Sequence, residues 1–152
     1  MPIRVAVVLV LACLAIVAPA AAQTSAAADD VFAGADACRP CHVAIHEAWS
    51  RTKHARALRS LSAAYQAREE CVTCHITALP GTVAAQLGAP RHPNVQCEAC
   101  HGPGRDHVAT QPALAGLVAR PGEAVCVTCH NAKSPSFKGF FFAGMKAFVH
   151  RP

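Results

Sequence analysis

Four copies of one short pattern, Cys-x-x-Cys-His, carry the most informative chemistry of this chain. Two thiols separated by two residues and followed at once by an imidazole form the attachment site of a c-type haem. One turn of chain directs both thiols to the vinyl groups of a porphyrin, and the next residue reaches the iron from the same side. The predicted thioether cysteines are Cys38, Cys41, Cys71, Cys74, Cys97, Cys100, Cys126 and Cys129, and the predicted proximal iron ligands are His42, His75, His101 and His130. The pattern therefore predicts four covalent haem c groups, each with its iron.

Two other uses of paired cysteines explain the pattern less well. Four such pairs could build two zinc ribbons, and disulfides suit an exported chain. Neither use requires a histidine directly after the second cysteine, and that histidine is present in all four motifs. The repeated unit therefore favours haem over zinc and over disulfides.

Each iron keeps a second axial position, and the histidines outside the motifs are the candidates to fill it. Nine histidines are present, so five remain beyond the four motifs. Methionine, the other common ligand, remains only as Met145 once an N-terminal leader is removed. We therefore expect mostly bis-histidine ligation, which gives lower potentials than His/Met ligation. The distal candidates are His54, His107, His150 and His92, and His46 is the fifth histidine.

The positions of these histidines depend on the elements that carry them. Residues 37–67 are rich in Ala, Leu, Arg and Glu, with no Pro or Gly after Pro40, and this composition predicts a helix. At 100° per residue, His46 lies about 40° from His42 and shares its side of the first haem. We therefore expect His46 to contact a propionate rather than that iron. His54 lies about 120° from His42, so it points to a different haem.

Two further segments are expected to deliver ligands from beyond this helix. Residues 102–104 (Gly-Pro-Gly) predict a turn that brings His107 back over the haem cluster. His150 closes a tail of four phenylalanines whose rings can pack on porphyrin. Trp49, seven residues after the first motif histidine, is expected to pack on the first haem.

Composition leaves little material for a conventional core. The 152 residues are 53% hydrophobic, but only 5% are aromatic, and much of the apolar share is alanine and the N-terminus. The predicted fold class is mainly α: a small, haem-packed helical multihaem cytochrome with long loops and little sheet. The haems supply the apolar interior, so the polypeptide without them is expected to be unstable.

The N-terminus has the features of a secretory signal. Arg4 is followed by thirteen apolar residues and then by Ala-Pro-Ala-Ala-Ala, which predicts a signal peptide cleaved after Ala22 or Ala20. The apolar run is shorter than the roughly 20 residues of a spanning helix, so no stable membrane insertion is expected after cleavage. A retained anchor, or a lipoprotein modified at Cys13, stays open. The predicted divisions are signal peptide 1–22, flexible lead-in 23–34 and tetrahaem cytochrome c domain 35–152, exported to the periplasm or the cell surface.

The net charge of +5 does not predict a nucleic-acid partner. Haem propionates bring the assembled protein near neutrality, and no basic patch is interleaved with aromatic residues. The expected partners are redox proteins: an oxidoreductase donor and an acceptor in the quinone pool or a terminal cytochrome. The sequence leaves the oligomeric state open.

These motifs together resemble the cytochrome c-554/c-prime type family of tetrahaem cytochromes. The resemblance rests on the first motif with the stretch 49–57, on residues 95–107 around the third motif, and on the fourth motif with the C-terminal histidine. It implies a mainly helical fold whose haems form closely stacked pairs. It also implies His107 as distal ligand of the first haem, His54 of the third and His150 of the fourth. The second haem of that family can be five-coordinate, and His92 would close that position here.

An electron carrier without catalytic residues is the function that these features favour. The alternative is a small haem enzyme that redox-converts a nitrogen or sulfur oxo-species at a five-coordinate second haem. It would need a distal acid or base, and His46, His92, Glu98 and Arg91 form no recognisable constellation. Two further hypotheses for the function are a filament of stacked haem-carrying subunits and a membrane-anchored cytochrome that oxidises quinol.

Overall fold

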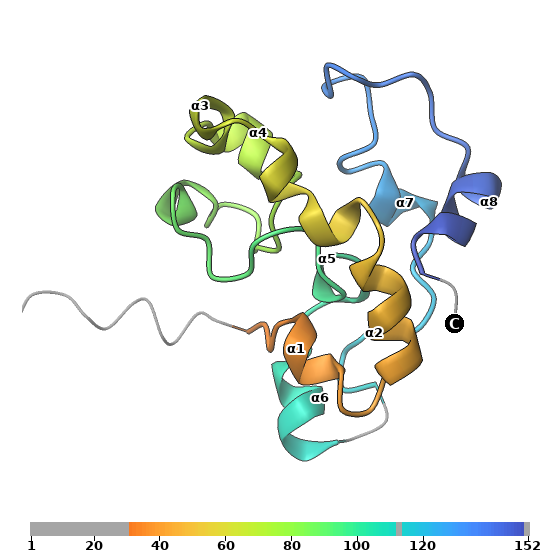
Figure 1. The fold of residues 1–152 in the computed structure, drawn as a ribbon. Helices are drawn as coiled ribbons and strands as arrows, with labels where there is room; N and C mark the ends of the chain where they lie inside the picture. Colours follow the sequence, from red (N-terminus) through yellow and green to blue (C-terminus); the bar gives the residue numbers. More distant parts are fainter. Residues whose placement is uncertain (1–30, 112–113, 151–152) are drawn as a thin grey trace, which may run out of the picture.

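The computed structural model describes residues 31–111 and 114–150. The predicted signal peptide and the lead-in up to residue 30 lie outside these residues. Within them the chain forms short helices joined by long loops, and its only β-type pairing is one isolated bridge between Ile76 and Pro93 (Figure 1). The predicted mainly helical class is therefore confirmed. The α-helices are α1 (Ala35–Cys38), α2 (Val43–Ser50), α3 (Ala63–Gln66), α4 (Glu69–Val72), α5 (Glu98–His101), α6 (Arg105–Thr110), α7 (Glu123–Cys126) and α8 (Phe142–Met145), and 3₁₀ helices span His54–Arg56, Leu58–Ser60, Ala84–Gln86 and Lys146–Phe148.

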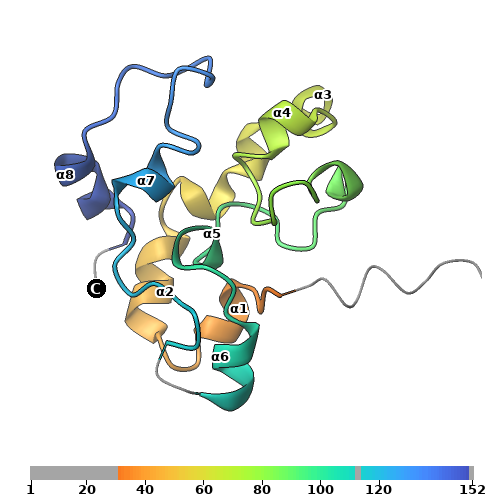
Figure 2. The same cartoon turned by 180° about the vertical axis from the view of Figure 1, so that it is seen from behind.

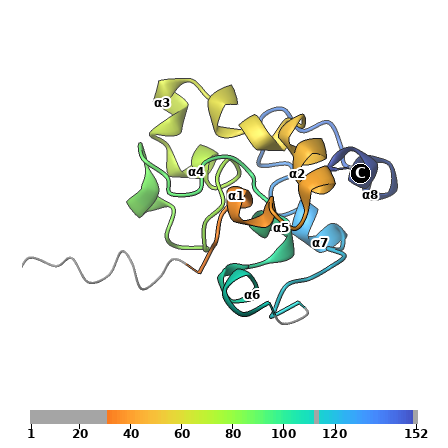
Figure 3. The same ribbon diagram turned by 60° about the horizontal axis from the view of Figure 1, so that its bottom comes forward.

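Helix α5 lies near the centre of the fold, and the other helices lie around it (Figure 1). Helices α3 and α4 lie on one side of it, and α7 and α8 lie on the opposite side (Figures 1 and 2). Helix α6 projects away from both groups, beyond α5, in the tilted view (Figure 3). Helix α5 belongs to the third Cys-x-x-Cys-His motif. This arrangement therefore places the third motif close to segments from both ends of the described sequence.

The helix expected over residues 37–67 is broken into α1, α2, two 3₁₀ helices and α3. After α2, the Thr52 hydroxyl donates to the carbonyl of Trp49 at 2.7 Å and accepts from the amide of Ala55 at 3.4 Å. A threonine hydroxyl that bonds the backbone in this way competes with the regular helical ladder. The prediction of one continuous helix is therefore wrong, and angles counted along it do not place His54.

The apolar core made by side chains is small. It consists of Val72, Ile76 and Val83, packed against the partly buried Leu58, Ala78 and Leu87. Many large apolar side chains of the described residues are instead exposed: Val43, Ile45, Tyr65, Val108, Leu114, Val118, Val127, Phe137, Phe141, Met145 and Phe148. A small core beside so many exposed apolar side chains is consistent with a further apolar component in the assembled protein.

A buried hydroxyl ties the segment after the second motif to residues 92–96. Thr77 is 1% exposed, donates to the carbonyl of Asn94 at 3.1 Å and accepts from the amide of Gln96 at 2.9 Å. Its own amide donates to the carbonyl of His92 at 2.9 Å. Thr77 thereby positions the chain that leads into the third motif.

Thr77→Val is expected to lower the free energy of unfolding of the haem-loaded protein by about 1–3 kcal/mol. Valine keeps the shape but leaves the buried partners of the hydroxyl without a hydrogen bond. Guanidinium unfolding followed by haem absorbance measures the change. Thr110→Val is the matched control, because the Thr110 hydroxyl is exposed and bonds only the local Asp106 carbonyl at 2.8 Å. We expect it to change the stability by less than about 0.5 kcal/mol, and equal losses in the two variants would contradict the role of Thr77.

Candidate functional site

Each Cys-x-x-Cys-His motif begins in or next to a short helix. Helix α1 ends at Cys38, α4 holds Cys71, α5 follows Cys97 directly, and α7 ends at Cys126. In the first, third and fourth motifs, the histidine amide donates to the carbonyl of the first cysteine at 2.9–3.0 Å. This bond closes one helical turn, so the first thiol and the imidazole start from the same side of the chain.

The backbone also orients two of the motif imidazoles. The Nδ1 atom of His75 lies 2.7 Å from the carbonyl oxygen of Ala57, and that of His101 lies 2.7 Å from the carbonyl oxygen of Val118. A carbonyl oxygen can only accept, so Nδ1 carries the proton in both rings. The Nε2 atom then keeps its lone pair for a metal ion, which is the second-sphere arrangement typical of metal-binding histidines.

Thiols from different motifs contact one another. None of the eight described cysteines forms a disulfide. A hydrogen bond between Cys38 and Cys97 raises the pKa of Cys38 and lowers that of Cys97. A second such bond raises the pKa of Cys74 and lowers that of Cys129 to about 6. The first motif therefore adjoins the third, and the second adjoins the fourth.

Two of the distal candidates lie against motif histidines. The His54 and His130 ring centroids are 6.0 Å apart with an interplanar angle of 67°, and the His101 and His150 centroids are 6.1 Å apart at 26°. Burial, and then the neighbouring His130, lower the pKa of His54, which keeps its imidazole neutral as metal binding requires. The family resemblance implied the reverse combination, with His54 at the third motif and His150 at the fourth. The ring contacts bring His150 to the third motif and His54 to the fourth, and His54 also lines the hollow at the third motif.

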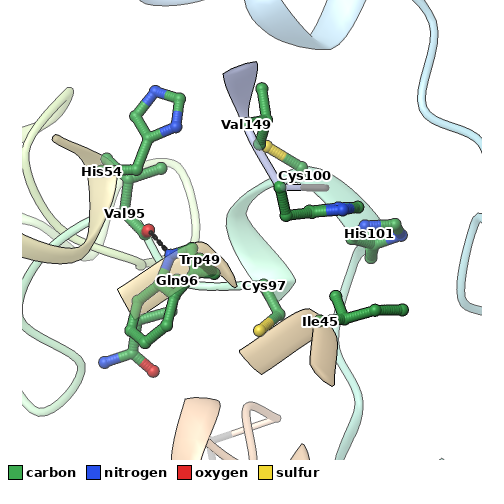
Figure 4. Close-up of a pocket in the computed structure, with 10 residues that line it drawn as sticks. Ile45, Trp49, His54, Val95, Gln96, Cys97, Cys100, His101 and Val149 are labelled. Atoms are coloured by element: carbon green, nitrogen blue, oxygen red, sulfur yellow. Dashed lines mark hydrogen bonds between the residues drawn. The ribbon is translucent and has the colours of Figure 1, made fainter. Parts of the chain in front are cut away.

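The third motif opens into a shallow hollow lined largely by apolar side-chain surface (Figure 4). Trp49 forms one wall and is held there by a hydrogen bond from its indole nitrogen to the carbonyl of Val95, at 3.0 Å (Figure 4). The structure thus places Trp49 at the third motif, which adjoins the first, and the packing of Trp49 on the first haem stays a prediction. The lining residues are Ile45, Trp49, His54, Val95, Gln96, Cys97, Cys100, His101, Val149 and His150.

The remaining histidine candidates lie elsewhere. The His92 ring packs edge-on against Phe32 with centroids 5.6 Å apart, at the chain that enters α1. The His46 ring lies 5.3 Å from that of Trp49, and its Nε2 is 3.7 Å from an oxygen of Asp36. His107 lies in α6, whose first amide donates to the carbonyl of Val31 ahead of the first motif at 3.2 Å.

These residues fit a covalently attached porphyrin. Paired thiols stand beside a motif histidine, an apolar hollow adjoins one such pair, and two imidazoles have Nε2 kept for a metal. The small core and the exposed apolar side chains are consistent with an apolar group of this kind. Each cysteine pair would hold a macrocycle by thioether bonds, and each motif histidine would bind its iron.

Comparisons with known proteins agree with this chemistry. Residues 37–102 match the family model for cytochrome c554 and c-prime, and residues 89–135 match the model for a doubled CXXCH motif. The chain belongs to the multihaem c-type cytochromes. It is 33% identical over 100 residues to cytochrome c-554 of Nitrosomonas europaea, an alignment that covers 54% of this chain and 43% of that protein. The cytochrome thus spans less than half the length of this relative. No solved structure matches it.

Sequence reasoning missed several residues that shape the haem sites of this cytochrome. The carbonyls of Ala57 and Val118 orient two motif histidines, and backbone carbonyls leave no mark in a sequence. The sequence offers Glu98 as a candidate distal acid or base, but its side chain is 4% exposed and accepts hydrogen bonds from backbone amides. It is therefore a buried structural group and not a solvent-facing proton donor.

The described part of the cytochrome holds no helix that is both long enough and apolar enough to cross a membrane. The apolar run of the predicted signal peptide lies outside that part.

Proposed function

We propose that this cytochrome is an exported electron-transfer protein with four covalent haems c, most of them ligated by two histidines. The ring separations of the pairs His54–His130 and His101–His150, 6.0 and 6.1 Å, carry this proposal. Two imidazoles on opposite sides of one metal ion, each nitrogen about 2 Å from it, place their ring centroids about 6 Å apart. The rings can lie at any mutual angle about that axis, so both observed angles suit it.

The proposed chemistry follows from this ligation. Each bound haem would accept and release one electron at its iron. The histidine pairs would occupy both axial positions, leave no room for a substrate and hold the potential low. The Nδ1–H bonds of His75 and His101 to carbonyl oxygens would keep these rings in one orientation in both oxidation states.

The contacts among the cysteines support a definite order of haem sites. The first and third sites meet through Cys38 and Cys97, and the second and fourth meet through Cys74 and Cys129. Burial, and then the charges of Cys126 and Cys129, raise the pKa of Cys100 to about 11, which links the third site to the fourth. We infer a line of sites in the order first, third, fourth, second. Two close pairs at its ends agree with the stacked pairs that the family resemblance implies.

The predicted signal peptide supports a periplasmic location for this carrier. A periplasmic relay needs a donor and an acceptor, and we propose an oxidoreductase on one side and a quinone-pool or terminal cytochrome on the other. The alignment covers less than half of the named relative, so that relative does not indicate the partners of this chain. Both partner classes are inferred from the proposed function alone.

Electron paramagnetic resonance of the oxidised, haem-loaded protein tests the ligation. We expect four haems by intact mass, with the low-spin irons in the majority. His107→Ala should convert one low-spin iron to high spin, since α6 lies beside the chain that enters the first motif and we propose His107 as the ligand there. His46→Ala is the control, because its ring packs on Trp49, and it should leave the spin count unchanged. An unchanged count in the His107 variant would refute that ligand.

Catalysis at the second haem is the second candidate function. The rings of His54, His150 and His92 lie by His130, His101 and Phe32, and this distribution favours an open position on the second iron. A high-spin signal in the unaltered protein, together with turnover of hydroxylamine or nitric oxide, would support an enzyme. A fully low-spin spectrum would exclude this candidate.

A further inference from the structure

Glu98 is a carboxylate buried in the middle of the fold, inside the third haem motif. It is 4% exposed. One of its oxygens accepts from the amides of Ala33 at 2.8 Å and Gly104 at 2.7 Å, and the other accepts from the amide of Gly34 at 2.8 Å. Three charge-assisted hydrogen bonds of this length stabilise a buried carboxylate without a cationic partner.

The three amides belong to segments that are far apart in the sequence. Ala33 and Gly34 lead directly into α1, and the carbonyl of Gly34 lies 3.7 Å from the Cys38 sulfur, which donates to it. Gly104 precedes α6, the helix that carries His107. One side chain therefore joins the first motif, the third motif and the helix with the candidate distal ligand of the first haem.

The backbone around Glu98 is shaped to receive its carboxylate. Gly34 has φ +84°, a conformation that favours glycine, and this conformation presents its amide to Glu98. A Cβ atom added to Gly104 would lie 3.1 Å from a Glu98 oxygen. Glycine at both positions lets the main chain approach the carboxylate closely.

We propose that Glu98 is a positioning residue for the first and third haem sites, where it also supplies a buried negative charge that lowers their reduction potentials. This inference rests on the proposed attachment of haem at these two motifs. By holding the start of α6, the carboxylate fixes the approach of His107 to the first iron. Its charge favours the ferric state, since a buried anion acts in a low effective dielectric.

The thiols of the two motifs support the electrostatic part of the proposal. The pKa of Cys38 is raised first by its hydrogen bond with Cys97 and then by burial, and the Glu98 charge adds to the rise. The hydrogen bond from Cys38 lowers the pKa of Cys97, and the Glu98 charge acts in the opposite direction. The field of Glu98 therefore reaches an attachment point of each site.

Two substitutions separate the charge from the geometry. Glu98→Gln keeps the length and removes the charge; its amide oxygen can still accept from Ala33 and Gly104, but its amide nitrogen cannot accept from Gly34. We expect two of the midpoint potentials to rise, each by at least tenfold in the one-electron equilibrium constant, about 59 mV. Glu98→Asp keeps the charge but is one methylene shorter and cannot reach all three amides. We expect it to release α6 and convert one low-spin iron to high spin, as His107→Ala does.

The matched control is Glu123→Gln, which removes an exposed carboxylate close to the fourth motif. Water screens this charge, so no potential should change by more than about twofold in the equilibrium constant. Equal effects of the two glutamine variants, or unchanged potentials in Glu98→Gln, would overturn the electrostatic part. An unchanged low-spin count in Glu98→Asp would overturn the positioning part.

Gly104→Ala keeps the test decisive if the Glu98 variants yield no haem-loaded protein. Its added Cβ displaces the carboxylate while the charge is retained, so we expect a changed low-spin signal of the first haem with a normal haem content. An unchanged signal would overturn the proposal.

Peptide mass mapping of the unaltered protein distinguishes a failure of the proposed function from a failure of the role proposed for Glu98. Missing haem at the first and third motifs would refute the proposed function, whereas attached haem with silent variants would refute only the role of Glu98.

Discussion

Replacing Cys71 and Cys74 by alanine will remove one haem from the cytochrome and destabilise the entire protein. The second motif begins in α4 beside Val72, which belongs to the small core of side chains. Its Cys74 contacts Cys129 of the fourth motif. We expect the free energy of unfolding to fall by at least about 3–5 kcal/mol, the cost of deleting a large aromatic side chain from a core, because a porphyrin is larger still.

Intact mass and thermal unfolding measure this effect. The mass should fall by one haem in addition to the two sulfur atoms, and the transition should move to a lower temperature and broaden. The single substitution Cys71→Ala is the control, since one thioether and the motif histidine remain to hold the macrocycle. It should keep the haem and lose less stability. A double variant that unfolds normally with unchanged haem content would refute attachment at the second motif.

His54→Ala and His150→Ala will each convert one low-spin iron to high spin, and the two irons will belong to the fourth and third motifs respectively. This assignment follows from the ring contacts of His54 with His130 and of His150 with His101. Loss of one imidazole leaves a five-coordinate iron, and added free imidazole should restore the low-spin signal. The expected change in each variant is one iron of the four.

A combined variant decides which motif each histidine serves. In a protein that lacks the fourth haem through Cys126→Ala and Cys129→Ala, His54→Ala should cause no further loss of low-spin signal. In the same background, His150→Ala should still convert one iron. The opposite result would restore the assignment implied by the family resemblance, and the ring contacts would then not represent ligation.

The covalent chemistry of the cytochrome could be predicted from sequence because it is local. A thioether pair and a proximal ligand occupy five consecutive residues, such as 97–101, and one helical turn brings them together. The small supply of aromatic and branched residues likewise indicated that peptide alone makes little core. The core that the described side chains form is accordingly small, and it is built around Val72, Ile76 and Val83.

The continuity of the first helix could not be predicted from composition. Residues 37–67 have the helix propensity that was inferred, yet the Thr52 hydroxyl bonds the backbone on both sides and interrupts the ladder. Propensity sums over a window, whereas a break depends on one side chain and its rotamer. Helical-wheel angles counted from His42 therefore do not apply to residues after that break, and the direction expected for His54 is one of them.

The sequence by itself predicted where the haems attach, which atoms hold them and that the fold depends on them, and it predicted the helical class that the structure confirms. Only the tertiary structure decided which motifs adjoin, which histidine faces which motif, and that Glu98 binds three amides instead of acting as an acid. The physical reason is the range of the interactions. Thioether attachment and helical turns connect neighbours in the chain, but a ring pair such as His101 and His150, or a carboxylate that reaches Gly34, depends on the path of all the intervening loops.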